Sequence, residues 1–148
     1  MTREDKELLL KDLCARLPYG VKVRCDFGLD GEITEISRTK NNLYYCKYLD
    51  CKEGYCYIES LKPYLFPLSS MTEEQFVELK VFADLIYESD TLELVEWNDN
   101  YKTLEFWLEE VPSYCVIKVF DWLNKNHFDY RGLIEKGLAI DATGLNIY

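Results

Sequence analysis

Apolar residues near the start of the chain recur at helical spacing. Leu9, Leu13 and Leu17 lie four residues apart with charged residues between them, so they share one face of a helix. Thr2 precedes this pattern as a cap, and the sequence "PYG" that follows Leu17 ends it. The pattern predicts a first helix over residues 2–17.

The spacing changes to alternation from residue 21 to residue 60. "VKVRCDF" alternates apolar and charged residues and predicts a strand, and "LDGE" supplies an Asp-Gly turn into a second strand, "EITEIS". The polar turns "RTKNN" and "KEG" lead into "LYYCKYLD" and "YCYIES", which predict two more strands. Short strands joined in this way predict a small, curved antiparallel sheet, and an SH3-like partial barrel is one form that it can take.

Two prolines in "LKPYLFPLSS" predict an extended crossing over the surface, which leads to a well-marked second helix. Thr72 is followed three residues later by the glutamine of a capping box, and Met71 can staple onto Phe76. Val77 and Val81 thicken the apolar stripe that follows. We therefore expect this helix to be well buried.

Residues 91–110 allow two interpretations. "TLELVEW" and "YKTLEFWL" flank the turn sequence "NDN", which favours a second hairpin, but the second arm also fits a helix. A further helix is predicted through "YCVIKVFDWLNKN", followed by a short helical turn that ends at Gly137 and an extended tail. With no internal repeat and no flexible linker, residues 1–148 are predicted to form a single compact α+β domain.

The stretch "YYCKYLDCKEGYCY" contains three cysteines five residues apart, Cys46, Cys51 and Cys56. Structural zinc sites take four converging ligands, usually from close cysteine pairs, and this spacing supplies neither a close pair nor a nearby fourth ligand. A hairpin that turns at residues 51–54 would place Cys56 near Tyr48 or Leu49 of the opposite strand. We therefore expect a hairpin with small apolar thiols rather than a metal site.

Tyrosines crowd the same stretch and admit a functional interpretation. Tyr44, Tyr48 and Tyr57 are candidates for an exposed aromatic platform that binds a small molecule or a protein. Ordinary cross-strand packing of aromatic residues is the alternative, and both interpretations stay open.

The net charge of −10 is concentrated in one part of the chain. Residues 72–110 contain twelve acidic residues and two basic ones, and the remainder contains fifteen of each. This balance leaves no general basic surface for DNA, RNA or anionic lipid, so we expect no direct nucleic-acid or membrane partner. No stretch resembles a membrane span or a secretory signal, which predicts a cytoplasmic protein whose thiols stay reduced.

The sequence offers little reactive chemistry. His127 is the single histidine, and no nucleotide-binding, zinc-protease or serine-hydrolase motif occurs. A nucleophilic pair of His127 with Cys115 is disfavoured, because His127 lies beyond a predicted helix end and is expected to cap or pack there. We expect no enzyme, no catalytic residue, no cofactor and no bound metal.

The acidic segment is the predicted contact surface. We expect it to bind a protein partner through carboxylates and two aromatic anchors, namely Glu93, Glu96, Asp99, Glu105, Glu109, Glu110, Trp97 and Tyr101. A narrower alternative is that these carboxylates imitate the phosphates of a duplex and so inhibit a basic host defence or DNA-handling enzyme. A merely solvated face is the third interpretation, and the sequence leaves the oligomeric state open.

Two stretches, "KPYLFPLSSMTEEQ" and "DWLNKNHFDYRGLIEKGLAIDA", resemble a family of small proteins encoded in gut Bacteroides-type bacteria, their prophages and their phages. The opening "KELLLKDLCARLPYGVKV" resembles the same family. The resemblance implies a phage-associated protein of mobile-element origin. It implies no activity, so no functional residue is carried over from it.

Overall fold

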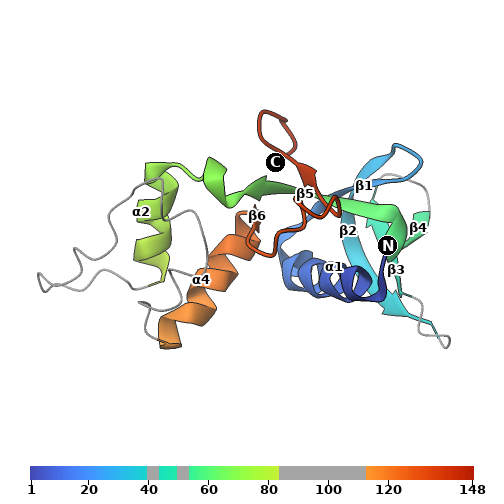
Figure 1. Ribbon diagram of the computed structural model, residues 1–148, viewed down its shortest axis with the longest axis horizontal. Helices are drawn as coiled ribbons and strands as arrows, with labels where there is room; N and C mark the ends of the chain where they lie inside the picture. Colours follow the sequence, from blue (N-terminus) through green and yellow to red (C-terminus); the bar gives the residue numbers. More distant parts are fainter. Residues whose placement is uncertain (40–43, 50–53, 84–112) are drawn as a thin grey trace, which may run out of the picture. The chain divides into compact units, whose positions relative to one another are not determined.

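The computed structural model describes residues 1–39, 44–49, 54–83 and 113–148, and it shows an α+β protein (Figure 1). An N-terminal helix is followed by a small mixed sheet that is not closed into a barrel, and then by further helices. The predicted fold class is therefore confirmed. Residues 91–110, for which the sequence allows a hairpin or a helix, lie outside the described residues.

The chain divides into two compact units. Unit 1 comprises Met1–Leu65 and Arg131–Tyr148, and unit 2 comprises Phe66–Tyr130. Each unit has its own hydrophobic core. A single domain over residues 1–148 stays a prediction.

Helix α1 (Arg3–Arg16) opens unit 1 with the predicted cap. Thr2 Oγ1 accepts a hydrogen bond from Asp5 N (3.1 Å), and the Asp5 carboxylate accepts one from Thr2 N (3.2 Å). This reciprocal pair satisfies two amide groups that the first helical turn would otherwise leave unpaired. A 3₁₀ turn (Leu17–Tyr19) and Gly20, at φ 68°, end the helix as predicted.

The four predicted strands form an antiparallel meander in unit 1: β1 (Lys22–Cys25), β2 (Asp30–Arg38), β3 (Tyr44–Leu49) and β4 (Gly54–Tyr57). Strand β5 (Leu61–Pro67) then returns to pair antiparallel with β1, which gives the order β4-β3-β2-β1-β5. A short strand, β7 (Ile140–Asp141), pairs in parallel with β5 at Tyr64 and Leu65. The hairpin predicted for the cysteine- and tyrosine-rich stretch is confirmed by the pairing of β3 with β4.

The turn between β1 and β2 does not lie where the sequence suggested. Asp30 and Gly31 were expected to form it, but both belong to β2. The chain instead reverses at Gly28, whose N donates to Cys25 O (2.9 Å) and whose φ is 75°. Gly28 takes the positive φ more readily than any other residue type, so it decides the turn. Phe27 consequently lies at the tip, 81% exposed, rather than on the apolar face of a strand.

Strand β5 also differs from its prediction. It is extended, but it does not cross the surface, because Leu61, Tyr64 and Leu65 are at most 1% exposed. Strand β1 pairs with residues 61–63 of β5, and β7 pairs with residues 64–65. Pro63 is therefore paired with β1 but not with β7. This position suits proline, because proline has no N–H to donate to a second strand.

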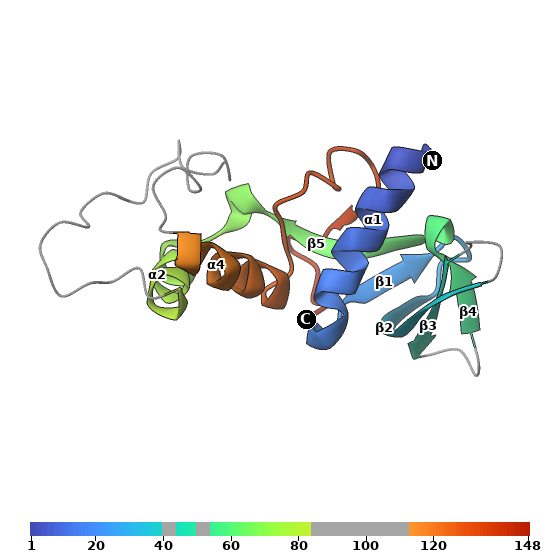
Figure 2. The ribbon, with the colours of Figure 1, turned by 90° about the horizontal axis from the view of Figure 1, so that it is seen from below.

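The core of unit 1 lies between α1 and the sheet (Figure 2). Leu9 and Leu13 of the helix are fully buried against the inward residues of the strands and of the segment after residue 131. The other members of this cluster are Val21, Val23, Cys25, Ile33, Cys56, Ile58, Leu61, Leu65, Leu133, Leu138 and Ala139.

The described part of unit 2 contains the helices α2 (Glu73–Phe82) and α4 (Ser113–Lys125) and a short strand, β6 (Phe128–Asp129). The predicted capping box of α2 is confirmed, since Thr72 Oγ1 accepts from Gln75 N (3.2 Å) and Gln75 Oε1 accepts from Thr72 N (2.9 Å). Strand β6 pairs in parallel with the end of β5 at Phe66 and Pro67.

The buried face of α2 is narrower than predicted. Phe76 and Leu79 are 1% exposed and Met71 joins them in the core, as the predicted staple requires. Val77 and Val81, however, are 45% and 58% exposed. The buried stripe of this helix therefore covers one side only.

The core of unit 2 contains a pair of stacked aromatic side chains. Trp122 stacks on Phe128 with ring centroids 5.6 Å apart, and both are 1% exposed. Just beyond α4, His127 is 6% exposed with φ 58°, and its N donates to Asn124 O (3.2 Å). His127 thus occupies the left-handed position that commonly ends a helix, in agreement with a capping and packing role.

Candidate functional site

The residues of the predicted contact surface lie outside the part of the chain that the structure describes. They are Glu93, Glu96, Trp97, Asp99, Tyr101, Glu105, Glu109 and Glu110. Their sequence positions nevertheless assign all of them to unit 2, which spans Phe66–Tyr130.

The division into units coincides with a division of charge. Residues 66–130 contain fourteen Asp and Glu against four Lys and Arg, and the residues of unit 1 contain thirteen of each. The net charge of −10 therefore belongs to unit 2. Among the described acidic residues of that unit, Glu73, Glu74 and Glu78 of α2 are exposed to solvent.

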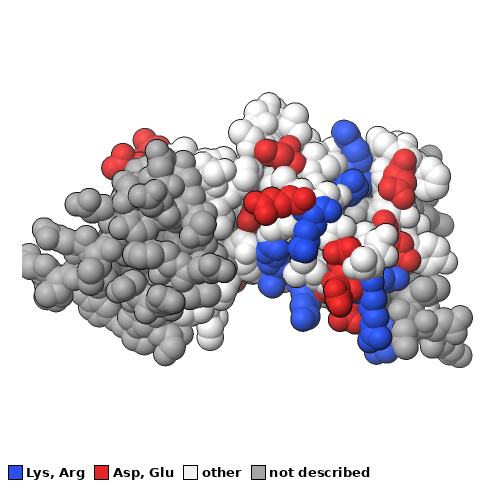
Figure 3. Space-filling view, in the orientation of Figure 1, with Lys and Arg blue, Asp and Glu red and all other residues white. Residues whose placement is uncertain are grey.

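The balanced charges of unit 1 are arranged as ion pairs. Figure 3 shows basic and acidic side chains interleaved over this unit. The pairs on its surface include Lys6–Glu59 (2.8 Å), Lys22–Glu32 (3.2 Å) and Arg24–Asp30 (2.8 Å). Neighbouring charges of opposite sign cancel at a distance, so this surface has little field of its own.

The Arg24–Asp30 pair belongs to a hydrogen-bonded cluster on this surface. Arg24 donates twice to the Asp30 carboxylate (2.8 and 2.9 Å), and the Tyr64 hydroxyl donates to the same carboxylate (2.7 Å). The hydrogen bonds from Arg24, with a smaller contribution from Tyr64, hold the pKa of Asp30 below its usual value. Burial, together with Asp30, raises the pKa of Tyr64 to about 12. The carboxylate stays charged and the phenol stays protonated, which suits a structural cluster rather than acid–base catalysis.

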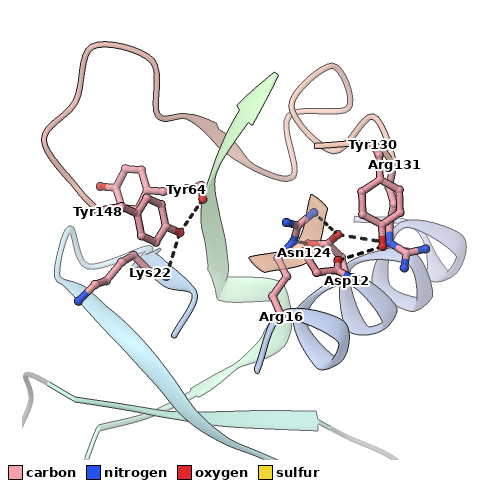
Figure 4. A network of polar contacts seen from close by, with 8 residues as sticks. All are labelled: Asp12, Arg16, Lys22, Tyr64, Asn124, Tyr130, Arg131 and Tyr148. Atoms are coloured by element: carbon pink, nitrogen blue, oxygen red, sulfur yellow. Dashed lines mark hydrogen bonds and ion pairs between the residues drawn. The ribbon is translucent and has the colours of Figure 1, made fainter. Parts of the chain in front are cut away.

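A second polar cluster lies inside unit 1 (Figure 4). Asp12 and Arg16 of α1 are 0% exposed, and Arg16 donates to both carboxylate oxygens of Asp12 (2.8 and 3.0 Å). Arg131 Nε lies 3.3 Å from the same carboxylate. The sequence reasoning missed this cluster, although a signal was present. Together with Leu9 and Leu13, positions 12 and 16 complete the i, i+3, i+4, i+7 spacing of a buried helix face.

Tyr148 closes a gap between β1 and β5 (Figure 4). Its hydroxyl accepts from Lys22 N (3.1 Å) and donates to Tyr64 O (2.8 Å). Lys22 and Tyr64 occupy the next positions after the Val23–Pro63 pair in the register of β1 and β5, so the Tyr148 hydroxyl bridges their backbone groups. Burial raises the pKa of Tyr148, so its hydroxyl keeps the proton that this bridge needs.

A pocket of about 350 Å³ lies at β4, the last strand of the sheet in the described part of the chain. The described residues that line it are Thr39, Tyr55, Cys56 and Tyr57. Tyr55 and Tyr57 are 57% and 53% exposed, whereas Cys56 between them is 8% exposed and faces the core. The tyrosines are therefore on the outer face of the strand.

The strand register does not assemble the tyrosine platform as predicted. Tyr57 pairs with Tyr45, so alternation places positions 44 and 48 of β3 on the other face of the sheet from Tyr57. Tyr44, Tyr48 and Tyr57 consequently do not share a face. In the described structure, Tyr55 accompanies Tyr57 at the pocket instead.

The expected position of Cys56 is also wrong. The sequence reasoning placed it near Tyr48 or Leu49, but its partner across the hairpin is Cys46. The reason is the position of the turn, because Gly54 starts β4 and pairs with Tyr48 instead of belonging to the turn. A shift of the turn centre by about one residue changes every partner across the hairpin.

Within the described ranges, no three His, Cys, Asp or Glu side chains are placed together so as to hold a metal ion. The helices described here include none whose length and apolarity would let it cross a membrane. Comparison with protein-family models, with curated proteins and with solved structures finds no match to this chain.

Proposed function

We propose that this chain is a non-enzymatic cytoplasmic binding protein, whose acidic unit 2 contacts a basic surface on a protein partner. The observation that carries the proposal is the coincidence of the charge excess with one structural unit. Charges that are concentrated in one unit steer a basic partner toward that unit and raise the association rate. The phage-associated origin implied by the family resemblance is part of the proposal.

The paired charges of unit 1 support the assignment of the contact to unit 2. Its thirteen acidic residues are matched by thirteen basic ones, and several are held in ion pairs of 2.8–3.2 Å. A partner that approaches from a distance therefore responds mainly to unit 2. Mimicry of a nucleic acid is the narrower form of the same proposal, in which the partner is a DNA-handling or host defence enzyme.

Two variants of equal net charge test the proposal. The first replaces six acidic residues of unit 2 by their amides, at Glu93, Glu96, Asp99, Glu105, Glu109 and Glu110. The matched control replaces six exposed acidic residues of unit 1, at Glu4, Glu7, Asp26, Glu35, Glu135 and Asp141. Both variants have a formal net charge of −4, since each loses six of the ten excess negative charges.

Affinity capture from host extract, at low and at high salt, provides the measurement. We expect the wild-type chain and the unit 1 variant to retain the same partner at low salt, and the unit 2 variant to lose it. If both variants lose the partner equally, net charge alone governs binding, and the proposal is contradicted. Competition by duplex DNA for the captured partner would identify the mimicry form, because mimic and duplex then occupy the same basic site.

Small-molecule binding at β4 is a second candidate function, and the pocket beside Tyr55 and Tyr57 is the observation that favours it. Half-exposed tyrosine rings offer faces on which a planar ligand can stack. A thermal-shift screen of planar compounds against the wild-type chain and the Tyr57→Leu variant tests this candidate. A ligand that stabilises the two chains equally would contradict it.

A further inference from the structure

The outer face of helix α2 exposes two apolar side chains. Val77 and Val81 lie one helical turn apart and are 45% and 58% exposed, although the sequence predicted that they would be buried. The buried residues Phe76 and Leu79 occupy the opposite side of the helix, against the core of unit 2. Val77 and Val81 therefore form an apolar ridge that the described part of unit 2 does not cover.

A row of carboxylates runs beside this ridge. Glu74 and Glu78 are exposed, and together with the two valines they complete the i, i+3, i+4, i+7 spacing of one helix face. Among the described residues, no ion pair involves either carboxylate. The basic residue of α2, Lys80, has its ammonium 4.9 Å from the ring centroid of Phe76, on the core-facing side. The outer face thus combines an apolar row with an acidic row.

We propose that the partner of unit 2 docks on this face of α2, and that the segment of the partner that docks is a basic amphipathic helix. This inference rests on the basic protein partner proposed above, and it adds the contact surface and the chemistry of the docking segment. A ridge of residues four apart packs into the groove between two rows of side chains on a second helix. The partner helix therefore needs an apolar row for the valines and a neighbouring row of Lys or Arg for Glu74 and Glu78.

Charge distinguishes between the possible occupants of this face. Residues 84–112 of the chain itself contain nine acidic residues and one basic residue, so their charge does not complement the carboxylates of α2. A second copy of the chain would bring two acidic faces together, with a formal net charge of −10 on each copy. A helix rich in Lys and Arg is instead attracted to the carboxylates, and its apolar row buries the valines.

The length of α2 limits the size of the contact. The helix has ten residues, so its outer face is about 15 Å long and accommodates about three turns of a partner helix. A contact of this size is smaller than a standard protein–protein interface. The charge of unit 2 as a whole therefore raises the association rate, and the paired rows on α2 select the segment that binds.

Photocrosslinking of the full-length chain tests the proposal. Benzoylphenylalanine is placed at position 77 or 81, and at position 117 as the control, because Ile117 of α4 is also apolar and is 76% exposed. Each chain is irradiated in host extract at low salt, and the linked peptide is sequenced by mass spectrometry. We expect positions 77 and 81 to link to one peptide, which is rich in Lys and Arg and has apolar residues three and four positions apart. Position 117 should not link to this peptide.

Titration of a synthetic copy of the linked peptide measures the contribution of each row. The double variant Val77→Gln, Val81→Gln should bind the peptide about 10-fold more weakly or worse, because it removes the apolar surface that binding buries. The double variant Glu74→Gln, Glu78→Gln should also bind more weakly, and its affinity should depend less on salt. Ile117→Gln should bind as the wild type does. Glutamine favours a helix at least as well as valine or isoleucine, and circular dichroism checks that each variant is folded.

The outcomes separate this inference from the function proposed for unit 2. If the wild-type chain retains no salt-sensitive partner, both are wrong. If the partner is retained but links at neither position 77 nor position 81, or if the valine variant binds the peptide as tightly as the wild type, only the site on α2 is wrong. Links to residues 84–112 of the same chain, to a second copy, or to a segment without basic residues also overturn the site.

Discussion

Unit 1 and unit 2 use charge in opposite ways. Unit 1 carries equal numbers of acidic and basic residues and buries a complete ion pair, Asp12–Arg16, at 0% exposure. Unit 2 centres its core on stacked aromatic rings, Trp122 and Phe128, and carries the whole excess of negative charge. Unit 1 thus holds several of its charges in ion pairs, whereas the sequence of unit 2 contains ten more acidic than basic residues.

This difference separates charge that stabilises the fold from charge that we propose contacts a partner. A buried ion pair must be complete, because one ion left alone in a low-dielectric interior is strongly destabilising. A carboxylate without a matching cation is tolerated on a surface and remains available to an external partner. The comparison therefore predicts that neutralising charges lowers stability in unit 1 and lowers partner binding in unit 2.

The largest effect is expected from breaking the buried ion pair. Asp12→Ala leaves Arg16 at 0% exposure without its carboxylate, and it removes the 3.3 Å contact with Arg131. The free energy of unfolding should fall by about 3–5 kcal/mol, as for other buried pairs that lose one partner. Urea unfolding followed by circular dichroism measures this change.

The matched control is an exposed ion pair on the same helix with the same i, i+4 spacing. Arg3 and Glu7 are 91% and 57% exposed, so Glu7→Ala should leave the stability unchanged within error. Equal effects of Asp12→Ala and Glu7→Ala would mean that burial does not distinguish the two pairs, and the contrast drawn for unit 1 would fail.

The aromatic core of unit 2 gives the next test. Trp122→Ala removes the stacking partner of Phe128 from a site that is 1% exposed, and it should cost about 3–5 kcal/mol. The indole Nε1 of Trp122 is buried and has no hydrogen-bond partner among the described residues. Trp122→Phe removes this N–H together with part of the ring, so the loss of a desolvation cost of about 1–3 kcal/mol offsets the cavity.

We therefore expect the free energy of unfolding of the Trp122→Phe variant to lie within about 1 kcal/mol of that of the wild type. It should be well above that of the Trp122→Ala variant. Thermal or urea unfolding of the three chains makes the comparison. A Phe variant as unstable as the Ala variant would show that the indole N–H is well satisfied in the folded chain.

The smallest effects are expected at the two helix caps, which differ in one chemical respect. Thr2→Ala and Thr72→Ala should each cost about 1 kcal/mol at neutral pH, because each removes a side-chain acceptor from a helix start. The box of α1 uses a carboxylate, Asp5, whereas the box of α2 uses the neutral amide of Gln75. Only the contribution of the α1 capping box to stability should depend on pH.

Hydrogen bonds from Thr2 hold the pKa of Asp5 below its usual value. A carboxylate whose pKa is lower in the folded chain stabilises the fold above its unfolded pKa, and this contribution disappears as the pH falls through the folded pKa. The cost of Thr2→Ala should therefore shrink below about pH 4, and that of Thr72→Ala should stay constant. Urea unfolding of each variant against the wild type at pH 7 and pH 3 measures both, and a parallel change at the two caps would refute the distinction.

Local features of the fold were predictable, and features that depend on distant partners were not. The starts of α1 and α2 follow from Thr2 and Thr72, because a capping box involves residues three positions apart. Strand β5 was misjudged, since its two prolines suggest a surface segment unless the positions of β1 and β7 are known. The candidate contact residues 93–110 were assigned from charge, and they lie outside the described part of the chain.

The sequence by itself determined the α+β class, the helix starts and the concentration of charge between residues 72 and 110, because composition and short-range spacing are read directly along the chain. Only the tertiary structure decided which charges are buried and which residues pair across the hairpin. Asp12 and Arg16 become a core pair when α1 lies on the sheet, and position 46 becomes the partner of position 56 when the hairpin turn sets the register. Burial and register are set by surfaces that meet across long sequence distances, so no local pattern contains them.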